Sequence, residues 1–184
     1  SLYVVYANTS PEKGMMQGTS SFIVPRGTEG FNIARCNETV GCRFMNNGEL
    51  EFVDCFVPDD QLLAEGDSLS KAGIYFRPGK IIQASKNLGV GQAALEKTSN
   101  FVQTYKRGGR LLLKHQIVAS RIADMATRIA AVRSLVMQAA KAVDIKSQDA
   151  EALCNMSKVF ASQEILHVCQ NAMELHGGMG AMLD

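Results

Sequence analysis

The sequence lacks the features that define several classes of protein. It has no CxxC pair, and its five cysteines are odd in number and irregularly spaced, which argues against a disulfide framework and a zinc site. The three histidines are scattered, with none at metal-ligand spacing, so we assign no metal ion. A formal net charge of +1 gives no general attraction to nucleic acid or to an anionic membrane. No stretch approaches the roughly 18 consecutive apolar residues of a membrane span, and the N-terminal residues do not resemble a signal peptide.

The composition is typical of a folded globular protein. Hydrophobic residues make up 46% of the 184 positions and charged residues 20%, which is enough apolar material to bury a core. A chain of this length holds one ordinary domain, or one domain and a piece of another. We expect its cysteines to be free thiols in a reducing compartment.

The first 65 residues indicate strands and turns. Short runs rich in β-forming residues alternate with stretches that contain glycine, proline and polar residues. Residues 36–48 have little periodicity and are expected to form a loop or an irregular strand. The predicted strands cover residues 2–7, 20–25, 31–35 and 50–57.

Beyond Gly66 apolar residues recur every three or four positions, which is the period of one face of an α-helix. Short connections favour an antiparallel bundle of three long helices, whose remaining faces need a fourth helix or another subunit. Ser147 or Asp149 is a candidate cap for the third helix, and Gly177–Gly178 is expected to end it. The helices are predicted over residues 80–106, 117–144 and 149–175, with strands only in the first 65 residues.

Three further segments stand out because each resembles a motif of one protein family, and they follow one another in that family's order and at its spacing. They are ELEFVDCFVPDDQLLA (49–64), GGRLLLKHQIVASRIADMA (108–126) and ELHGGMGA (174–181). The first resembles the strand and turn that close the middle β domain of acyl-CoA dehydrogenases. The second is similar to that family's R-x-x-F-G-x-x-x-x-x-x-Q-x-x-x-x-x-x-A-D-M motif, and the third to its Q-x-x-G-G-x-G-aromatic turn. Three matches in register are far more specific than one.

The resemblance implies an α+β fold. A partial antiparallel β domain (1–65) is followed by an incomplete helical domain (66–184) with three long helices of a four-helix bundle. It also implies an FAD-dependent oxidoreductase of fatty acid metabolism that converts an acyl-CoA to the 2,3-enoyl-CoA, with electron-transferring flavoprotein as electron acceptor. The implied assembly is a homodimer or homotetramer, without nucleic acid or a membrane span. The implied location is the cytoplasm, or the mitochondrial matrix in a eukaryote.

The family motifs assign roles to a few residues. Gln116 matches a glutamine that contacts the FAD adenine, although a polar residue on a helix surface is the alternative interpretation. Gly177 and Gly178 match the turn through which a backbone approaches the flavin, where a Cβ would block close approach. The same glycines also suit a simple helix C-cap. Lys80 matches an arginine near the substrate, with an ordinary lysine at a helix start as the alternative.

Other motif positions differ from the family pattern. Tyr105 stands where the family has an arginine that pairs with the FAD pyrophosphate, a charge-assisted contact that tyrosine cannot reproduce. Gly108 stands where the family has phenylalanine, and Glu174 puts a carboxylate where an amide meets the cofactor. Arg107 or Arg110 is a candidate substitute for the missing arginine, and a solvated charge is the alternative for each.

The sequence offers no candidate for the catalytic base. Most family members carry a glutamate beyond the glycine turn, and we expect this chain to be cut off before it. Others carry the glutamate at the start of the first bundle helix, a position that matches Gly79 here. We therefore name no catalytic residue and expect the chain by itself to be inactive. A non-catalytic structural or partner subunit of the same family is the alternative function.

Overall fold

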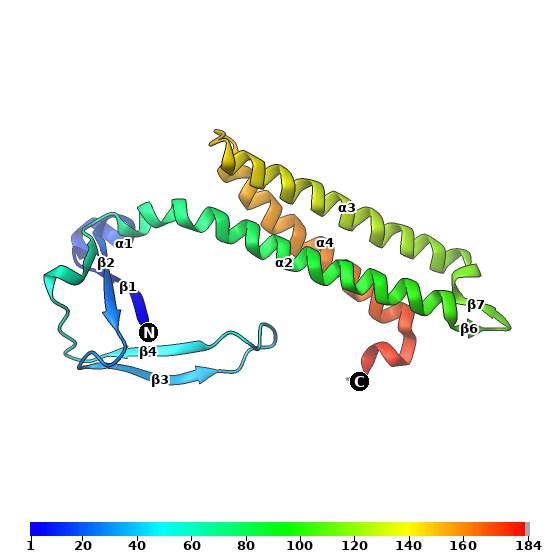
Figure 1. Cartoon of the computed structure of the whole chain (residues 1–184), viewed down its shortest axis with the longest axis horizontal. Coiled ribbons are helices and arrows are strands. Elements are labelled where there is room, and N and C mark those ends of the chain that lie inside the picture. Colours follow the sequence, from blue (N-terminus) through cyan, green and yellow to red (C-terminus); the bar gives the residue numbers. More distant parts are fainter. Residues whose placement is uncertain (183–184) are drawn as a thin grey trace. The chain divides into compact units, whose positions relative to one another are not determined.

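Helices dominate the computed structural model, which describes residues 1–182 and, at Ile74 and Tyr75, the backbone only. Contacts divide the chain into two units, Ser1–Ile74 and Tyr75–Asp184. Figure 1 shows strands in the first unit and long helices in the second. Each unit is described by itself below.

The first unit is built from short antiparallel strands. A three-stranded sheet has the order β1-β2-β5, and β3 and β4 form a separate hairpin. In this hairpin the ring of Phe31 stacks on Phe52 at a centroid distance of 4.8 Å and meets Tyr3 edge-on at 4.9 Å. These rings anchor the base of the hairpin. The elements in chain order are β1 (Leu2–Asn8), η1 (Pro11–Lys13), α1 (Gly14–Gly18), β2 (Thr19–Pro25), β3 (Phe31–Asn37), β4 (Asn47–Phe52), η2 (Asp59–Gln61) and β5 (Leu62–Ala64).

The first three predicted strands are confirmed, and the fourth is displaced. The strand expected over 50–57 instead begins at Asn47 and ends at Phe52. Asp54 has a φ of +48°, a conformation incompatible with continuing the strand. The predicted irregular region 36–48 is therefore shorter than expected, because both strands of the hairpin extend into it.

Three long helices form the second unit: α2 (Ser68–Thr104), which begins in the first unit, α3 (Gln116–Asp144) and α4 (Ala150–His176). The apolar stripe predicted for α3 is confirmed, since Met125 and Val132 are fully buried and Ile129 nearly so. Helices α3 and α4 pack along their lengths around this stripe (Figure 1). The core comprises Ala84, Met125, Ile129, Val132, Val136, Ala161, Ile165, Val168 and Ala172.

A small residue on α2 brings this helix close to α4. A Cβ added at Gly91 would lie 2.6 Å from Cδ1 of Ile165, nearer than real Cβ atoms come to other atoms. Gly91 therefore admits the Ile165 side chain to the space that a larger residue would fill. Within the part of the chain that the structure describes, no helix combines the length and the apolar character needed to cross a membrane.

The helix boundaries differ from prediction at α2. This helix begins at Ser68, upstream of the predicted start at residue 80, and contains Pro78 in its interior. Proline lacks the N–H that would bond the carbonyl four residues earlier, so α2 continues through Pro78 without that hydrogen bond. Gly79 consequently lies inside α2 and not at the start of a helix. At the other end of the unit, α4 ends as predicted, with Gly177 at a φ of +62°.

A short hairpin between α2 and α3 is a correction to the prediction that strands occur only in the first 65 residues. Strands β6 (Lys106–Arg107) and β7 (Arg110–Leu111) pair antiparallel, and a short 3-10 turn leads into α3. Gly108 and Gly109 connect them with φ values of +61° and +80°. Two consecutive residues at positive φ make the tight turn that a two-residue hairpin needs, and glycine adopts it without strain.

Candidate functional site

A pocket of about 350 Å³ lies where the C-terminal ends of α2 and α4 meet the β6–β7 hairpin. It brings together four of the five residues predicted to bind the cofactor, from two separate segments of the sequence: Tyr105, Glu174, Gly177 and Gly178. The other lining residues are Phe101, Arg107, Leu112, Leu175, His176, Met179 and Met182.

Stacked rings form one wall of this pocket. Phe101 stacks on Tyr105 one helical turn later, at a centroid distance of 4.9 Å, and on His176 of α4 at 4.4 Å. His176 is held in place because its Nδ1 donates a hydrogen bond to the carbonyl oxygen of Ala172, at 2.8 Å. Stacked aromatic rings offer a flat apolar surface that suits another planar ring. Tyr105 therefore contributes a ring to this surface, at the motif position where the family has a charged arginine.

The glycine turn forms a second part of the pocket. Gly177 has a φ of +62°, so it ends α4 in the conformation that favours glycine. A Cβ built at Gly177 or at Gly178 meets no heavy atom within 4 Å. Both glycines therefore face open space, and at Gly178 neither packing nor a positive φ requires glycine. Gly180 differs, because a Cβ there would lie 2.2 Å from the carbonyl oxygen of Met173.

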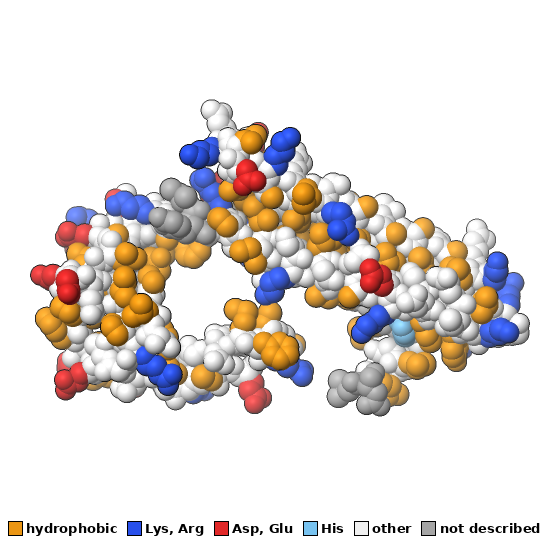
Figure 2. Space-filling model, in the orientation of Figure 1, with side chains coloured by type: hydrophobic (Ala, Val, Ile, Leu, Met, Phe, Trp, Pro, Cys, Tyr) orange, Lys and Arg blue, Asp and Glu red, His pale blue; other side chains and the backbone are white. Residues whose placement is uncertain are grey.

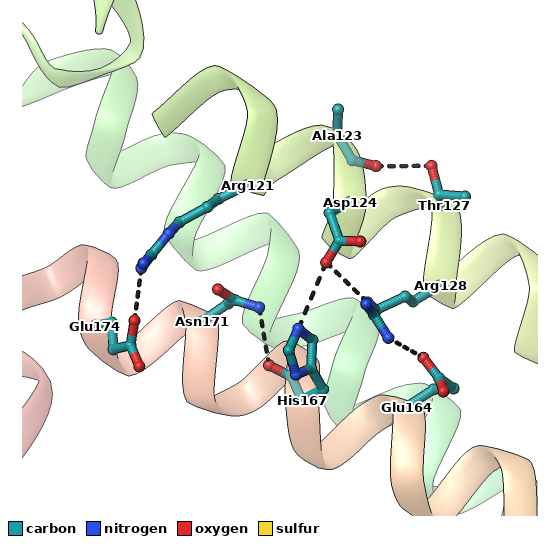
Figure 3. A network of polar contacts seen from close by, with 9 residues as sticks. All are labelled: Arg121, Ala123, Asp124, Thr127, Arg128, Glu164, His167, Asn171 and Glu174. Carbon is teal, nitrogen blue, oxygen red and sulfur yellow. Dashed lines mark hydrogen bonds and ion pairs between the residues drawn. The ribbon is translucent and has the colours of Figure 1, made fainter. Parts of the chain in front are cut away.

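Glu174, the departure from the family's glutamine, has an ionic partner. Its Oε2 accepts a hydrogen bond from Nη1 of Arg121 on α3, at 2.6 Å (Figure 3). Both side chains are partly solvent exposed, so the pair adds at most about 1 kcal/mol to stability. Its main consequence is local, since Arg121 offsets the negative charge that Glu174 brings to the pocket.

A larger polar cluster links the same two helices farther along. Arg128 donates hydrogen bonds to Asp124, at 2.8 Å, and to Glu164, while Nε2 of His167 lies 3.7 Å from Asp124 (Figure 3). The hydrogen bond from Arg128 holds the pKa of Asp124 below its ordinary value, with the nearby positive charge acting in the same direction. The two carboxylates raise the pKa of Arg128. Because the cluster lies outside the pocket lining, we interpret it as a link between α3 and α4.

We expect the Asp124→Asn change to make the stability of the folded protein depend less steeply on pH in the acid range. The folded-state pKa of Asp124 is depressed, so its contribution is fully present above the ordinary value of 3.8 and is lost as the pH falls through the folded-state pKa. The side chain is 41% exposed, so the loss is a fraction of a kcal/mol, on the order of 0.5. Thermal midpoints measured by circular dichroism at pH values above and below the ordinary pKa of Asp124 test this expectation, with Glu29→Gln as the control. Equal slopes for parent and Asp124→Asn would contradict the prediction.

The remaining predicted site residues lie outside the pocket lining. Gln116 is the exposed first residue of α3, a few positions after Leu112. Lys80 lies in α2, separated from Phe101 by roughly 30 Å along the helix at ~1.5 Å per residue. Its position near Cys154, whose pKa is raised mainly by burial, puts it beside the N-terminal half of α4. A substrate role for Lys80 and a cofactor role for Gln116 stay predictions.

Sequence reasoning missed three residues that shape the pocket: Phe101, Arg121 and His176. The spacing of Phe101 and Tyr105 places both on one helix face, which is a usable sequence signal. Neither the Arg121–Glu174 pair nor the contact of His176 with Phe101 leaves such a signal, because each joins different helices.

Comparisons with known proteins agree with this architecture. Residues 73–184 match the family described as "Acyl-CoA dehydrogenase, C-terminal domain". An acyl-CoA dehydrogenase of Bacillus subtilis (strain 168) is 33% identical over 184 residues, covering 100% of this chain and 48% of the relative. The chain belongs to the acyl-CoA dehydrogenase family.

Solved structures show the same fold. The butyryl-CoA dehydrogenase from Megasphaera elsdenii superposes with a TM-score of 0.92 at 29% identity, covering 98% of this chain and 47% of that one. An FAD complex of PigA superposes with a TM-score of 0.86 at 26% identity, with the same two coverages. The chain thus spans about half the length of the proteins it matches.

Proposed function

We propose that this chain is part of a flavin-dependent acyl-CoA dehydrogenase that oxidises an acyl-CoA thioester to the 2,3-enoyl-CoA. The observation that carries the proposal is the pocket at the ends of α2 and α4, which gathers Tyr105, Glu174, Gly177 and Gly178. A related protein of the same fold, PigA, is described as an FAD complex. Together these support FAD as the cofactor.

The pocket residues suit a nucleotide cofactor. The open space beside Gly177 and Gly178 lets the backbone approach a ligand that a Cβ would displace. The Phe101–Tyr105–His176 stack provides a flat surface for a ring, and Arg107 provides positive charge. At about 350 Å³ the pocket is at the small end of ligand sites, so it holds part of a dinucleotide.

In the proposed reaction the flavin and the protein have different roles. The bound flavin supplies the hydride acceptor, and the protein supplies orientation and shelter from water. Residues of this chain act by binding and positioning, and we assign none of them as the base that removes the α-proton. Lys80, on the other half of α2, is our candidate for contact with the acyl-CoA. Electron-transferring flavoprotein is the proposed electron acceptor.

We also propose a homo-oligomeric assembly. Large apolar side chains lie exposed on all three long helices, which is unusual for faces in permanent contact with water. Figure 2 shows hydrophobic side chains spread along the helices. The exposed residues on these helices include Ile82, Val90, Ile117, Met137, Met156, Val159, Leu166 and Met173.

One experiment tests the function. The full-length protein, purified with its flavin, is mixed anaerobically with short-chain and medium-chain acyl-CoA, and the flavin absorbance is followed. We expect the oxidised flavin band to bleach, because hydride transfer from the substrate reduces the flavin. The second candidate, a non-catalytic partner subunit, is favoured by Tyr105 and Glu174 at the motif positions. Protein that carries no flavin, or a flavin that no acyl-CoA bleaches, would support it instead.

A further inference from the structure

Helix α2 is anchored by different neighbours near its start and farther along. Near its start Ser68 is 3% exposed, and its hydroxyl donates a hydrogen bond to the carbonyl oxygen of Ala64, at 2.9 Å. The same hydroxyl accepts a hydrogen bond from the hydroxyl of Ser21 in β2, at 3.3 Å. Ala72, one turn later, is also buried. Farther along, Ala84 is fully buried in the core of the long helices. The helix therefore has one anchor among the strands and another in the bundle.

Between these two anchors α2 has little packing to hold it. None of the described side chains from residue 73 to residue 83 is buried, and Phe76 is 51% exposed. Arg77 pairs with Glu151 of α4 at 2.9 Å, but both side chains are partly exposed, and such pairs add little stability. A stretch with few buried contacts opens more easily than one in a core.

The sequence weakens the helix in the same stretch. Pro78 has no N–H to bond the carbonyl oxygen of Ile74, and its ring crowds that carbonyl. Gly79 follows directly, and glycine is among the weakest helix formers. A Cβ built at Gly73 or at Gly79 meets no heavy atom within 4 Å, so close packing does not require glycine at either position. Proline is also one of the common causes of a sharp bend in a helix.

We infer that residues 73–79 form a hinge in α2, at which the helix opens locally and changes direction. Backbone rotations within the hinge leave the segments 68–72 and 80–104 intact, because each is held by its own anchor. The contacts of the chain also divide inside this stretch, between Ile74 and Tyr75. The inference does not depend on the proposed flavin function, since the pocket lies at the other end of α2.

Amide hydrogen exchange of the full-length protein, followed by mass spectrometry, tests the hinge. We expect the amides of residues 74–80 to exchange about tenfold or more faster than those of residues 125–136 in the core of α3. The double change Pro78→Ala and Gly79→Ala restores the missing donor and raises helix propensity, so it should slow exchange at 74–80 about tenfold or more. Gly89→Ala is the matched control, because Gly89 lies in the same helix with equally open space at its Cβ position. It should change exchange at 74–80 less than about threefold.

Two outcomes of the exchange experiment would overturn the hinge. One is protection of residues 74–80 in the parent that equals the protection of residues 125–136. The other is equal slowing by Gly89→Ala, which would indicate a general stabilisation of α2. Proteolysis gives an independent measurement, since cleavage within a helix requires local opening. Chymotrypsin is expected to cut the parent after the exposed Phe76 and to cut the double variant about tenfold or more slowly, whereas equal rates would count against the hinge.

Discussion

Replacing Gly178 by valine in the full-length protein is expected to lower FAD affinity by about 5- to 150-fold, the range for forcing extra side-chain atoms into a filled site. The helical content should stay unchanged. A Cβ at Gly178 meets no protein atom within 4 Å, so the fold has room for the side chain. The added atoms would instead occupy space that we assign to the cofactor. Flavin absorbance per protein, measured together with circular dichroism, separates the two effects.

Gly180→Val is the matched control for this experiment. It lies two residues away in the same turn, but its Cβ would lie 2.2 Å from the backbone oxygen of Met173. Backbone cannot move aside as a flexible side chain can, so this substitution should lower the thermal midpoint as well as the flavin content. If Gly178→Val lowered the midpoint of the flavin-free protein to the same degree as Gly180→Val, the glycine pair would be a structural cap, and its cofactor role would be wrong.

The second large effect is expected in the helical core. Met125 on α3 is fully buried, and its truncation to alanine should lower the free energy of unfolding by about 2–5 kcal/mol. The loss combines the transfer energy of the side chain with the cavity left between the helices. Urea unfolding of the 184-residue chain, followed by helical circular dichroism, measures it. Met137→Ala on the same helix is the control, since Met137 is 65% exposed and its loss should change stability by less than about 0.5 kcal/mol.

A small effect of Met125→Ala would show that the α3 stripe does not pack as described. An equally large effect of Met137→Ala would instead indicate that its face is covered by another subunit. That second outcome would support the proposed homo-oligomer, and the dependence of the urea midpoint on protein concentration would confirm it.

Helix α3 was predictable from sequence because its apolar positions repeat with the helical period over many turns, from Val118 to Val136. The β6–β7 hairpin was not, since strands of two residues have no period to detect. The start of α2 was missed for a different reason. Pro78 and Gly79 look like a boundary, but the helix continues through them despite the lost hydrogen bond. The division of the domains at residues 65 and 66 stays a prediction.

For the candidate site too, some features could be predicted from the sequence and others could not. Tyr105, Glu174, Gly177 and Gly178 came from motif spacing alone, and the folded chain gathers them at one pocket. Their physical surroundings could not be predicted. The Arg121 partner of Glu174 lies on another helix, and such a pairing depends on how α3 and α4 align.

The close approach of α2 to α4 at Gly91 also bears on how this sequence can change over evolutionary time. Because Ile165 fills the space where a side chain at position 91 would lie, the permitted sizes at the two positions depend on each other. Alanine at 91 requires the Ile165 side chain to shift, and a smaller residue at 165 leaves a void while glycine remains at 91. The two sites therefore constrain each other epistatically, and a lineage that enlarges one is expected to have reduced the other.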